Sequence, residues 1–208
     1  MIIRNLITTA LFFALTSGSA FAEIDNATLV EKLRQGGYVI LFRHAITDQS
    51  QSDTDPNNLD NCGAQRNLNQ AGRDQSAAIG KAVKSLNIPI GKVFSSLYCR
   101  CIETAELAFG NPETKLDLSS FMRETEEEKT RRVNVIRSLL GTRPDPKTNT
   151  VLVTHKHMLR LASGAQLSEG GAAVLKPEVD SRFQLIAIVP SSRWQAMLEA
   201  VNEEEETF

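Results

Sequence analysis

The 208-residue chain is poor in cysteine, histidine and tryptophan, and its basic residues form no long runs. It has three cysteines without a paired C-x-x-C spacing, which argues against a zinc knuckle. The formal net charge of −2 and the scattered lysines and arginines argue against a nucleic-acid-binding protein. Beyond residue 22, no segment is long and apolar enough to span a bilayer, so the sequence predicts no stable membrane anchor.

The first 22 residues have the pattern of a secretory signal peptide. Arg4 supplies a positive start, Leu6 to Leu15 form an apolar stretch, and Ala20-Phe21-Ala22 fits the small-x-small cleavage rule. A membrane anchor is the alternative, but threonine, serine and glycine dilute the stretch below the length that a spanning helix needs. We therefore expect a signal peptide over 1–22 and one domain over 23–208, exported to the periplasm or secreted.

Two of the three histidines occupy the same kind of position, at the end of an apolar run. Residues 38–42 read as a buried strand that ends in Arg43-His44, and residues 150–154 read as a second strand followed by His155. The carboxyl ends of strands in a parallel α/β sheet carry the ligand-handling residues. His44 and His155 are therefore candidate site residues.

Elsewhere, helices alternate with strands, which predicts an α/β protein with a mostly parallel sheet. Residues 45–67 are polar and lack an apolar period, so a long functional loop is expected there. The predicted helices cover Asn26–Gln35, Asn69–Leu86, Ile102–Phe109, 122–140 and a last helix from Trp194, and Asn26 is the expected cap of the first. Further strands are predicted over 92–96, 172–175 and 183–189. The strand over 92–96 is expected to be buried.

An odd number of cysteines in an exported chain permits one disulfide and leaves one thiol. Cys62 lies in the polar loop, whereas Cys99 and Cys101 flank Arg100. The preferred pair is Cys62–Cys99 and the alternative is Cys62–Cys101.

If the strands at 38–44, 92–96 and 150–155 are parallel, their ends bring Arg43, His44, Arg100 and His155 to one rim. Guanidinium groups match the geometry of phosphate oxygens, and a neutral imidazole is a nucleophile near pH 7. This combination predicts a site for a phosphate group.

At these residues the chain resembles the histidine phosphatase superfamily, the phosphoglycerate-mutase-like branch 1. The resemblance rests on Arg43-His44-Ala45, on Ser96 to Ala105 around Arg100, and on Val153-Thr154-His155, in that order along nearly the whole chain after residue 22. It implies a three-layer α/β/α fold. It also implies that His44 takes the phosphoryl group as a phosphohistidine, while Arg43, Arg100 and His155 bind its oxygens.

The family's general acid is usually a glutamate between the second arginine and the second histidine. The nearest match is Glu124, within Met122-Arg123-Glu124, and this is the predicted acid. Several other glutamates follow it, so a solvated helix face is the alternative interpretation.

The leading interpretation is an exported, metal-independent phosphomonoester hydrolase without a cofactor. Its predicted partners are a small phosphorylated substrate, such as a cell-envelope sugar or lipid phosphate, and inorganic phosphate as the product. The alternative is a binding module of the same fold that holds a phosphorylated ligand with little or no turnover. His157 and Arg66 are secondary candidates for contact with the substrate.

Overall fold

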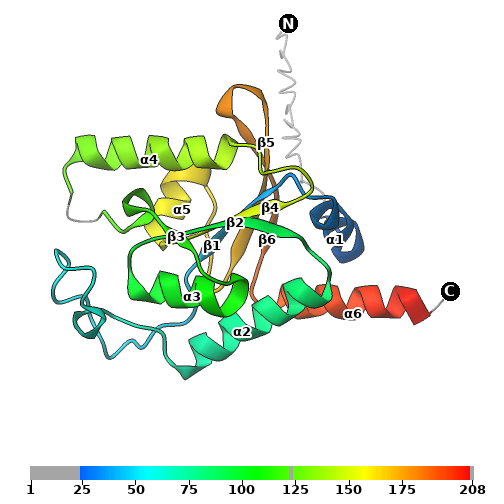
Figure 1. Ribbon diagram of the computed structural model, residues 1–208, viewed down its shortest axis with the longest axis horizontal. Helices are drawn as coiled ribbons and strands as arrows, with labels where there is room; N and C mark the ends of the chain where they lie inside the picture. The colour runs from blue at the N-terminus through cyan, green and yellow to red at the C-terminus, as the bar shows by residue number, and fades with distance from the viewer. Residues whose placement is uncertain (1–23, 122–123, 207–208) are drawn as a thin grey trace, which may run out of the picture.

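The computed structural model describes residues 24–121 and 124–206, so the predicted signal peptide lies outside the described residues. The helices and strands alternate along most of the chain (Figure 1). They are α1 (Asn26–Gln35), β1 (Val39–Arg43), α2 (Gln70–Ser85), β2 (Ile90–Ser95), α3 (Cys99–Phe109), β3 (Glu113–Thr114), α4 (Glu126–Gly141), β4 (Asn149–Thr154), α5 (Lys156–Ser163), β5 (Ala172–Pro177), β6 (Phe183–Val189) and α6 (Arg193–Glu206).

The strands form one six-stranded sheet in the order β3-β2-β4-β1-β5-β6. β1 and β2 each pair in parallel with β4, and β3 pairs in parallel with β2. β5 runs antiparallel to both of its neighbours, β1 and β6. The prediction of a mostly parallel sheet is confirmed, and β5 is the exception.

Helices cover both faces of the sheet. In Figure 1, α4 and α5 lie on the upper side, while α2, α3 and α6 lie on the lower side. Alternate residues of β1 enter two different cores, because successive side chains of a strand point to opposite faces. Ile40 and Phe42 pack with α1, α2, α3 and α6, whereas Val39 and Leu41 pack with α4 and α5. The predicted three-layer α/β/α architecture is therefore confirmed.

Several predicted element boundaries differ from the structure. The cap of α1 is Asp25, whose carboxylate accepts a hydrogen bond from the Thr28 backbone, and not Asn26. α3 begins at Cys99, three residues before the predicted start. α4 begins at Glu126, and the predicted start of that helix at 122–123 lies outside the described residues. α5 was not predicted at all.

The predicted burial of β2 is wrong for most of its length. Gly91 and Lys92 are exposed, and only Ser95 at the carboxyl end is buried. The two-residue strand β3 pairs only with Phe94 and Ser95, so the first half of β2 forms an edge of the sheet. Burial therefore increases toward the end of β2 that precedes Arg100.

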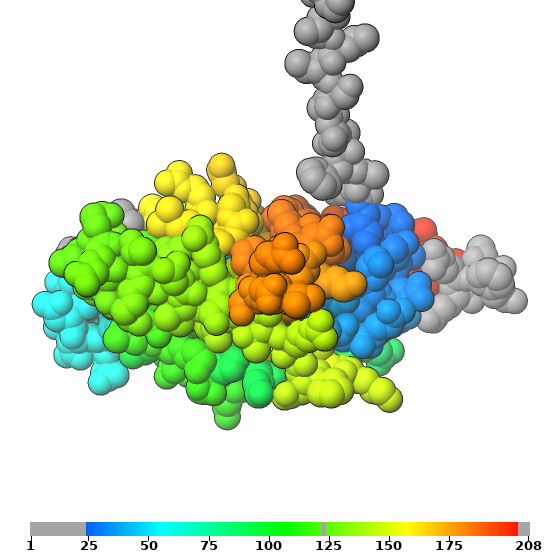
Figure 2. Space-filling model, turned by 90° about the horizontal axis from the view of Figure 1, so that it is seen from above, coloured from blue at the N-terminus to red at the C-terminus, as the bar shows by residue number. Residues whose placement is uncertain are grey.

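The segment 45–67 is a loop with one short turn of 3-10 helix at Cys62–Ala64. It forms the cyan end of the molecule, away from α1, in both views (Figures 1 and 2). Polar contacts organise it in place of an apolar core. The Thr54 backbone donates to Ala64, and the Asn67 side chain donates to the Cys62 carbonyl.

Within the described part of the chain, no helix has the length and apolar character that a membrane span requires.

Candidate active site

The four residues predicted at the sheet rim come together in the structure. Arg43 ends β1 opposite Thr154 of the parallel strand β4, and the His44 backbone donates to the Thr154 carbonyl. His155 follows β4 and begins α5, and Arg100 lies in the first turn of α3, after β2. The rings of His44 and His155 meet edge to face, with centroids 5.6 Å apart. The ring of Tyr98 contacts both the Arg100 guanidinium and the His155 ring, so Arg100 lies near the histidines, and its charge lowers the pKa of both.

His44 is buried and has one nitrogen committed to the backbone. Its Nδ1 lies 2.9 Å from the carbonyl oxygen of Ala45, its own neighbour in the chain. Because a carbonyl only accepts, this contact assigns the proton to Nδ1 and leaves the lone pair on Nε2. Burial, followed by the charges of Arg100 and Arg43, lowers the pKa of His44 to about 3. The ring is therefore neutral near pH 7, as a nucleophile requires.

His155 is fixed by contacts from α3 and from the turn that precedes it. Its Nε2 lies 2.8 Å from the Ser96 hydroxyl, and the Cys101 sulfur lies 3.6 Å from the same nitrogen. The ring also meets that of Tyr98 edge to face at 4.9 Å. Burial, with a smaller effect of Arg100, lowers the pKa of His155 well below its usual range.

Arg43 is held loosely at the rim. Its Nη1 donates to the Leu167 carbonyl at 3.2 Å, and its Nη2 lies 3.4 Å from the carboxylate of Glu169. The Glu169 carboxylate also accepts from the Thr47 hydroxyl. Burial, partly offset by Glu169, lowers the pKa of Arg43.

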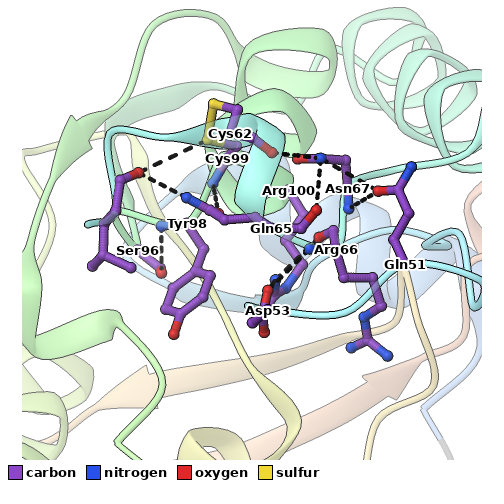
Figure 3. The surroundings of a disulfide bond; sticks show 11 residues. Gln51, Asp53, Cys62, Gln65, Arg66, Asn67, Ser96, Tyr98, Cys99 and Arg100 are labelled. Atoms are coloured by element: carbon purple, nitrogen blue, oxygen red, sulfur yellow. Dashed lines mark hydrogen bonds and ion pairs between the residues drawn. A yellow bond between two sulfur atoms is a disulfide. The ribbon is translucent and has the colours of Figure 1, made fainter. Parts of the chain in front are cut away.

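Arg100 is held more tightly, by the polar loop. Its Nη1 and Nη2 donate to the two oxygens of Asp53 at 2.9 and 3.2 Å, and Nη1 also donates to the Arg66 carbonyl (Figure 3). The guanidinium lies over the Tyr98 ring, 4.4 Å from its centroid. Its side chain is only 4 % exposed, against 18 % for Arg43.

The Nε atoms of both arginines are buried and have no hydrogen-bond partner among the described residues. Burying an N–H group without an acceptor costs about 1–3 kcal/mol. Two such donors beside two buried neutral histidines make a site for a group that brings its own acceptor oxygens. A phosphate group fits this requirement in charge and in geometry.

Arg66 lies near this cluster, and its charge also lowers the pKa of His44, His155 and Arg43. Its Nη1 donates to the Gln49 side chain at 3.3 Å, and its backbone N–H donates to Asp53. The loop thus adds a third guanidinium to the region. His157 is exposed on α5, two residues beyond His155.

Glu124 forms an ion pair with Arg132 of α4, at 3.1 Å. Arg132 is itself buried, and it also pairs with Glu128 and donates to the Leu116 carbonyl. No contact between Glu124 and His44 occurs among the described residues. Glu124 nevertheless lies only five residues beyond Ser119, whose hydroxyl is hydrogen-bonded to Ser96. The role of Glu124 as the general acid stays a prediction.

Several supporting residues were not identified from the sequence. Asp53 and Glu169 face the two arginines, and the hydroxyl of Thr104 accepts from the backbone N–H of Ala45, next to His44. Neither acid belongs to a sequence motif, and Thr104 lies within the segment Ser96 to Ala105 without being singled out there. Asp53 is one of several acids in a polar loop, and Glu169 lies in the turn before β5. Only their position in the fold identifies them.

The disulfide joins Cys62 to Cys99, as preferred from the sequence, and Cys101 is a buried free thiol. The alternative Cys62–Cys101 pairing is therefore wrong. Cys99 and Cys101 are two positions apart on α3, so they point in different directions. One reaches the loop and the other contacts His155. Burial raises the pKa of Cys101 to about 12.

A hollow of about 790 Å³ lies where the loop meets α2 and α3. Its lining includes both disulfide cysteines, Asn67, and the ion pair of Arg73 with Glu103. None of the four rim residues lines it. The disulfide thus contributes to the wall of this hollow, while the residue after Cys99 belongs to the rim.

Comparison with known proteins gives the same family as the motifs. The model of the histidine phosphatase superfamily (branch 1) matches residues 39–132, which include Arg43, His44, Arg100 and Glu124. Over this segment the chain has the sequence pattern of this superfamily. The match ends before His155, which the structure brings to the same rim through β4. No curated protein matches the sequence.

Solved structures, among them two phosphatases, share the fold at low sequence identity. The protein histidine phosphatase SixA, solved with tungstate, is 12 % identical with a TM-score of 0.52, covering 75 % of this chain and 98 % of its own. The mycobacterial glucosyl-3-phosphoglycerate phosphatase Rv2419c is 15 % identical with a TM-score of 0.51, covering 74 % and 99 %. The product of the open reading frame Rv3214 from Mycobacterium tuberculosis is 17 % identical with a TM-score of 0.51, covering 74 % and 97 %.

Proposed function

We propose that the protein hydrolyses phosphomonoesters through a phosphohistidine on His44. The observation that carries this proposal is the neutral His44 ring beside two arginines whose buried Nε–H groups lack acceptors. The phosphatase names of its structural neighbours support the same reaction class. One of them was solved with tungstate, a tetrahedral oxyanion like phosphate.

In the first step, Nε2 of His44 attacks phosphorus, and the bond between phosphorus and the ester oxygen breaks. Arg43 and Arg100 stabilise the negative charge on the non-bridging oxygens. His155, fixed by Ser96, donates a hydrogen bond to the same phosphoryl group. The arginines supply the positive charge that a metal ion supplies in other phosphoryl-transfer enzymes, so we propose that catalysis needs neither metal nor cofactor.

In the second step, a water molecule attacks phosphorus and the N–P bond breaks. The water gives one proton to the general acid, which is thereby restored to its protonated form. The electron pair of the N–P bond returns to Nε2, so His44 is again neutral, and inorganic phosphate leaves. The retained proton on Nδ1, hydrogen-bonded to the Ala45 carbonyl, keeps the ring in one tautomer through both steps.

The leaving alkoxide requires a proton, and we propose Glu124 as its donor. Glu124 would leave Arg132, take up a proton from solvent and donate it to the leaving oxygen, and it would recover that proton from the attacking water in the second step. A general acid contributes about 10²–10⁴ in rate, and it matters most for poor leaving groups. Glu124→Gln should therefore slow phenyl phosphate far more than p-nitrophenyl phosphate. Glu127→Gln, an exposed neighbour on α4 with the same charge change, is the matched control. Equal slowing of both substrates would contradict this role.

We further propose that the enzyme works outside the cytoplasm on a small phosphorylated substrate, such as an envelope sugar or lipid phosphate. The signal-like residues 1–22 support export, and the Cys62–Cys99 disulfide suits an oxidising compartment. A screen of phosphorylated sugars, lipids and nucleotides against residues 23–208 would identify the preferred class. Fractionation of cells that express the full chain would test the location.

A binding module that holds a phosphorylated ligand without turnover is the second candidate. The engagement of Glu124 by Arg132 favours it, since a site without a free proton donor turns over slowly. Release of phosphate from p-nitrophenyl phosphate separates the two proposals. The hydrolase requires release that His44→Ala abolishes. Saturable phosphate binding with no release would instead identify a binding module.

A further inference from the structure

Three of the five N–H groups of the Arg100 guanidinium donate to other residues of the protein, and two have no acceptor among the described residues. Asp53 accepts one from Nη1 and one from Nη2, and the Arg66 carbonyl accepts the other from Nη1. Two N–H groups remain without an acceptor among the described residues, one on Nε and the second on Nη2. In a guanidinium these two lie on the same edge and point the same way, which is the fork that binds two oxygens of one phosphate.

Asp53 therefore binds the edge of the guanidinium formed by Nη1 and Nη2, and it leaves the edge formed by Nε and Nη2 without an acceptor. We propose that Asp53 is the positioning residue of Arg100, which turns that open edge toward the phosphoryl group of the substrate. The inference rests on the proposed phosphatase function. It differs from a model in which the carboxylate occupies the phosphate position and has to leave before the substrate binds.

The surroundings of Asp53 fit a fixed support. Its Oδ1 accepts from the Arg66 backbone N–H at 3.0 Å, in addition to Arg100 (Figure 3). Burial raises the pKa of Asp53, but the hydrogen bonds from Arg100 and from the Arg66 backbone outweigh it, so the pKa lies below its usual value. The carboxylate is thus charged near pH 7 and holds no proton to donate to a leaving group.

The loop that carries Asp53 is attached beside Arg100 itself. Cys99, the residue before Arg100, is bonded to Cys62, and its backbone N–H donates to the Gln65 side chain at 3.0 Å. Gln65 in turn donates to the Leu59 carbonyl. Figure 3 shows these contacts around the disulfide, with Asp53 and Arg100 beneath them. The disulfide therefore attaches the loop to α3 at Cys99, the residue next to Arg100. On the loop side, the Arg66 backbone N–H is hydrogen-bonded to Asp53, so both partners of the ion pair are fixed.

The experiment compares Asp53→Asn and Asp53→Ala with Asp60→Asn. Asp60 is exposed on the same loop, and its substitution makes the same change in charge. The readouts are kcat and KM for p-nitrophenyl phosphate and for phenyl phosphate, and the equilibrium affinity for inorganic phosphate and tungstate. Each variant is also placed in an Arg100→Ala background, and thermal unfolding checks that each variant folds.

We expect Asp53→Ala to lower kcat/KM for both substrates about 10- to 100-fold, and to weaken phosphate binding by a similar factor. Asp53→Asn should have a smaller effect, because its amide oxygen still accepts from Nη1. Asp60→Asn should match the wild type within about twofold. In the Arg100→Ala background, the Asp53 substitutions should lower kcat/KM and phosphate affinity less than about twofold, because Asp53 acts through Arg100.

Three results would overturn the inference. Tighter phosphate binding by Asp53→Asn would show that the carboxylate competes with the phosphate. A loss confined to phenyl phosphate would make Asp53 a proton donor. Equal losses with and without Arg100 would show that Asp53 acts elsewhere. If Asp53→Ala does not fold, Asp53→Asn carries the same comparison.

The proposed function fails separately from this inference. A wild-type protein that hydrolyses no phosphomonoester contradicts the hydrolase, while its affinity for inorganic phosphate with and without Asp53 still tests the positioning role. If the wild-type protein hydrolyses phosphomonoesters and Asp53→Ala changes neither kcat/KM nor phosphate affinity, the proposed function stands and the positioning role of Asp53 is wrong.

Discussion

The two arginines of the rim have the same predicted role but different support. Arg43 ends a buried strand, and its contacts are a carbonyl at 3.2 Å and a carboxylate at 3.4 Å. Arg100 begins a helix, and a polar loop holds it through a two-point ion pair with Asp53. The strand fixes Arg43 through its backbone, so its side chain needs less support. The orientation of Arg100 depends on a loop that has no apolar core, and a disulfide ties that loop beside it.

This comparison implies that removing Arg100 costs more than removing Arg43. Loss of one group that stabilises the charge of a transition state typically costs about 10²–10³ in rate. We expect Arg100→Ala to lower kcat/KM about 10³-fold, because it also leaves the half-buried Asp53 carboxylate without its partner. Arg43→Ala should lower kcat/KM about 10²-fold. Steady-state kinetics with p-nitrophenyl phosphate measure both. A larger loss for Arg43→Ala would reverse the comparison.

The disulfide should matter more for the loop than for the sheet. It closes a loop of 37 residues, which in the chain-entropy model stabilises the folded state by about 4 kcal/mol. We expect a variant with serine at both Cys62 and Cys99 to lose stability of that order in urea unfolding. Wild-type protein treated with a reductant should give the same result. A loss below about 1 kcal/mol would show that the polar contacts alone hold the loop.

The buried histidines between the two arginines predict a loss of stability in acid. The unfolded chain takes up a proton on each histidine near pH 6.5, whereas folded His44 stays neutral to about pH 3. The unfolded state therefore binds more protons, and the free energy of unfolding falls as the pH drops below 6.5. His44 alone should cost about 2 kcal/mol by pH 5, and His155 adds to this loss in the same direction.

Urea unfolding at pH 7, 6 and 5 measures this dependence. His44→Asn should flatten it, while His157→Asn, at an exposed position, should leave it unchanged. A wild-type free energy of unfolding that is constant between pH 7 and 5 would contradict the buried neutral state of His44.

The smallest expected effect is that of Glu169, the acidic neighbour of Arg43. Its 3.4 Å contact is longer than those of Asp53, and Thr47 shares the same carboxylate. Ion pairs at partly exposed side chains contribute about 0–1 kcal/mol. Glu169→Gln should therefore lower kcat/KM less than about fivefold, well below the effect of Asp53→Ala. An equal effect of the two substitutions would mean that both arginines need an acidic support.

The sequence predicted the sheet rim better than the loop, for a physical reason. Apolar runs that end in Arg43-His44 and His155 follow directly from the period of a buried strand, and the parallel pairing then brings their ends together. The burial of β2 was predicted wrongly because a strand's neighbours in the sheet are not visible in its own residues. Asp53 could not be selected from a loop with several acids, because its role depends on where the disulfide places the loop.

The helix α5 was missed for a similar reason. It spans eight residues directly after β4, and Lys156, His157 and Arg160 interrupt its apolar positions. Met158 and Leu159 are nevertheless fully buried against the sheet. Short helices depend on tertiary packing more than on propensity, so the sequence alone gave little signal.

The most direct test of the account is to trap the phosphoenzyme. Wild-type protein is mixed with a ³²P-labelled phosphomonoester, quenched within the first turnovers and mapped by peptide. Catalysis through His44 predicts a label that is labile in acid and stable in base, located on the peptide that contains His44 and absent in His44→Ala. Hydrolysis that continues at the wild-type rate in His44→Ala, or a label on any other residue, would contradict it.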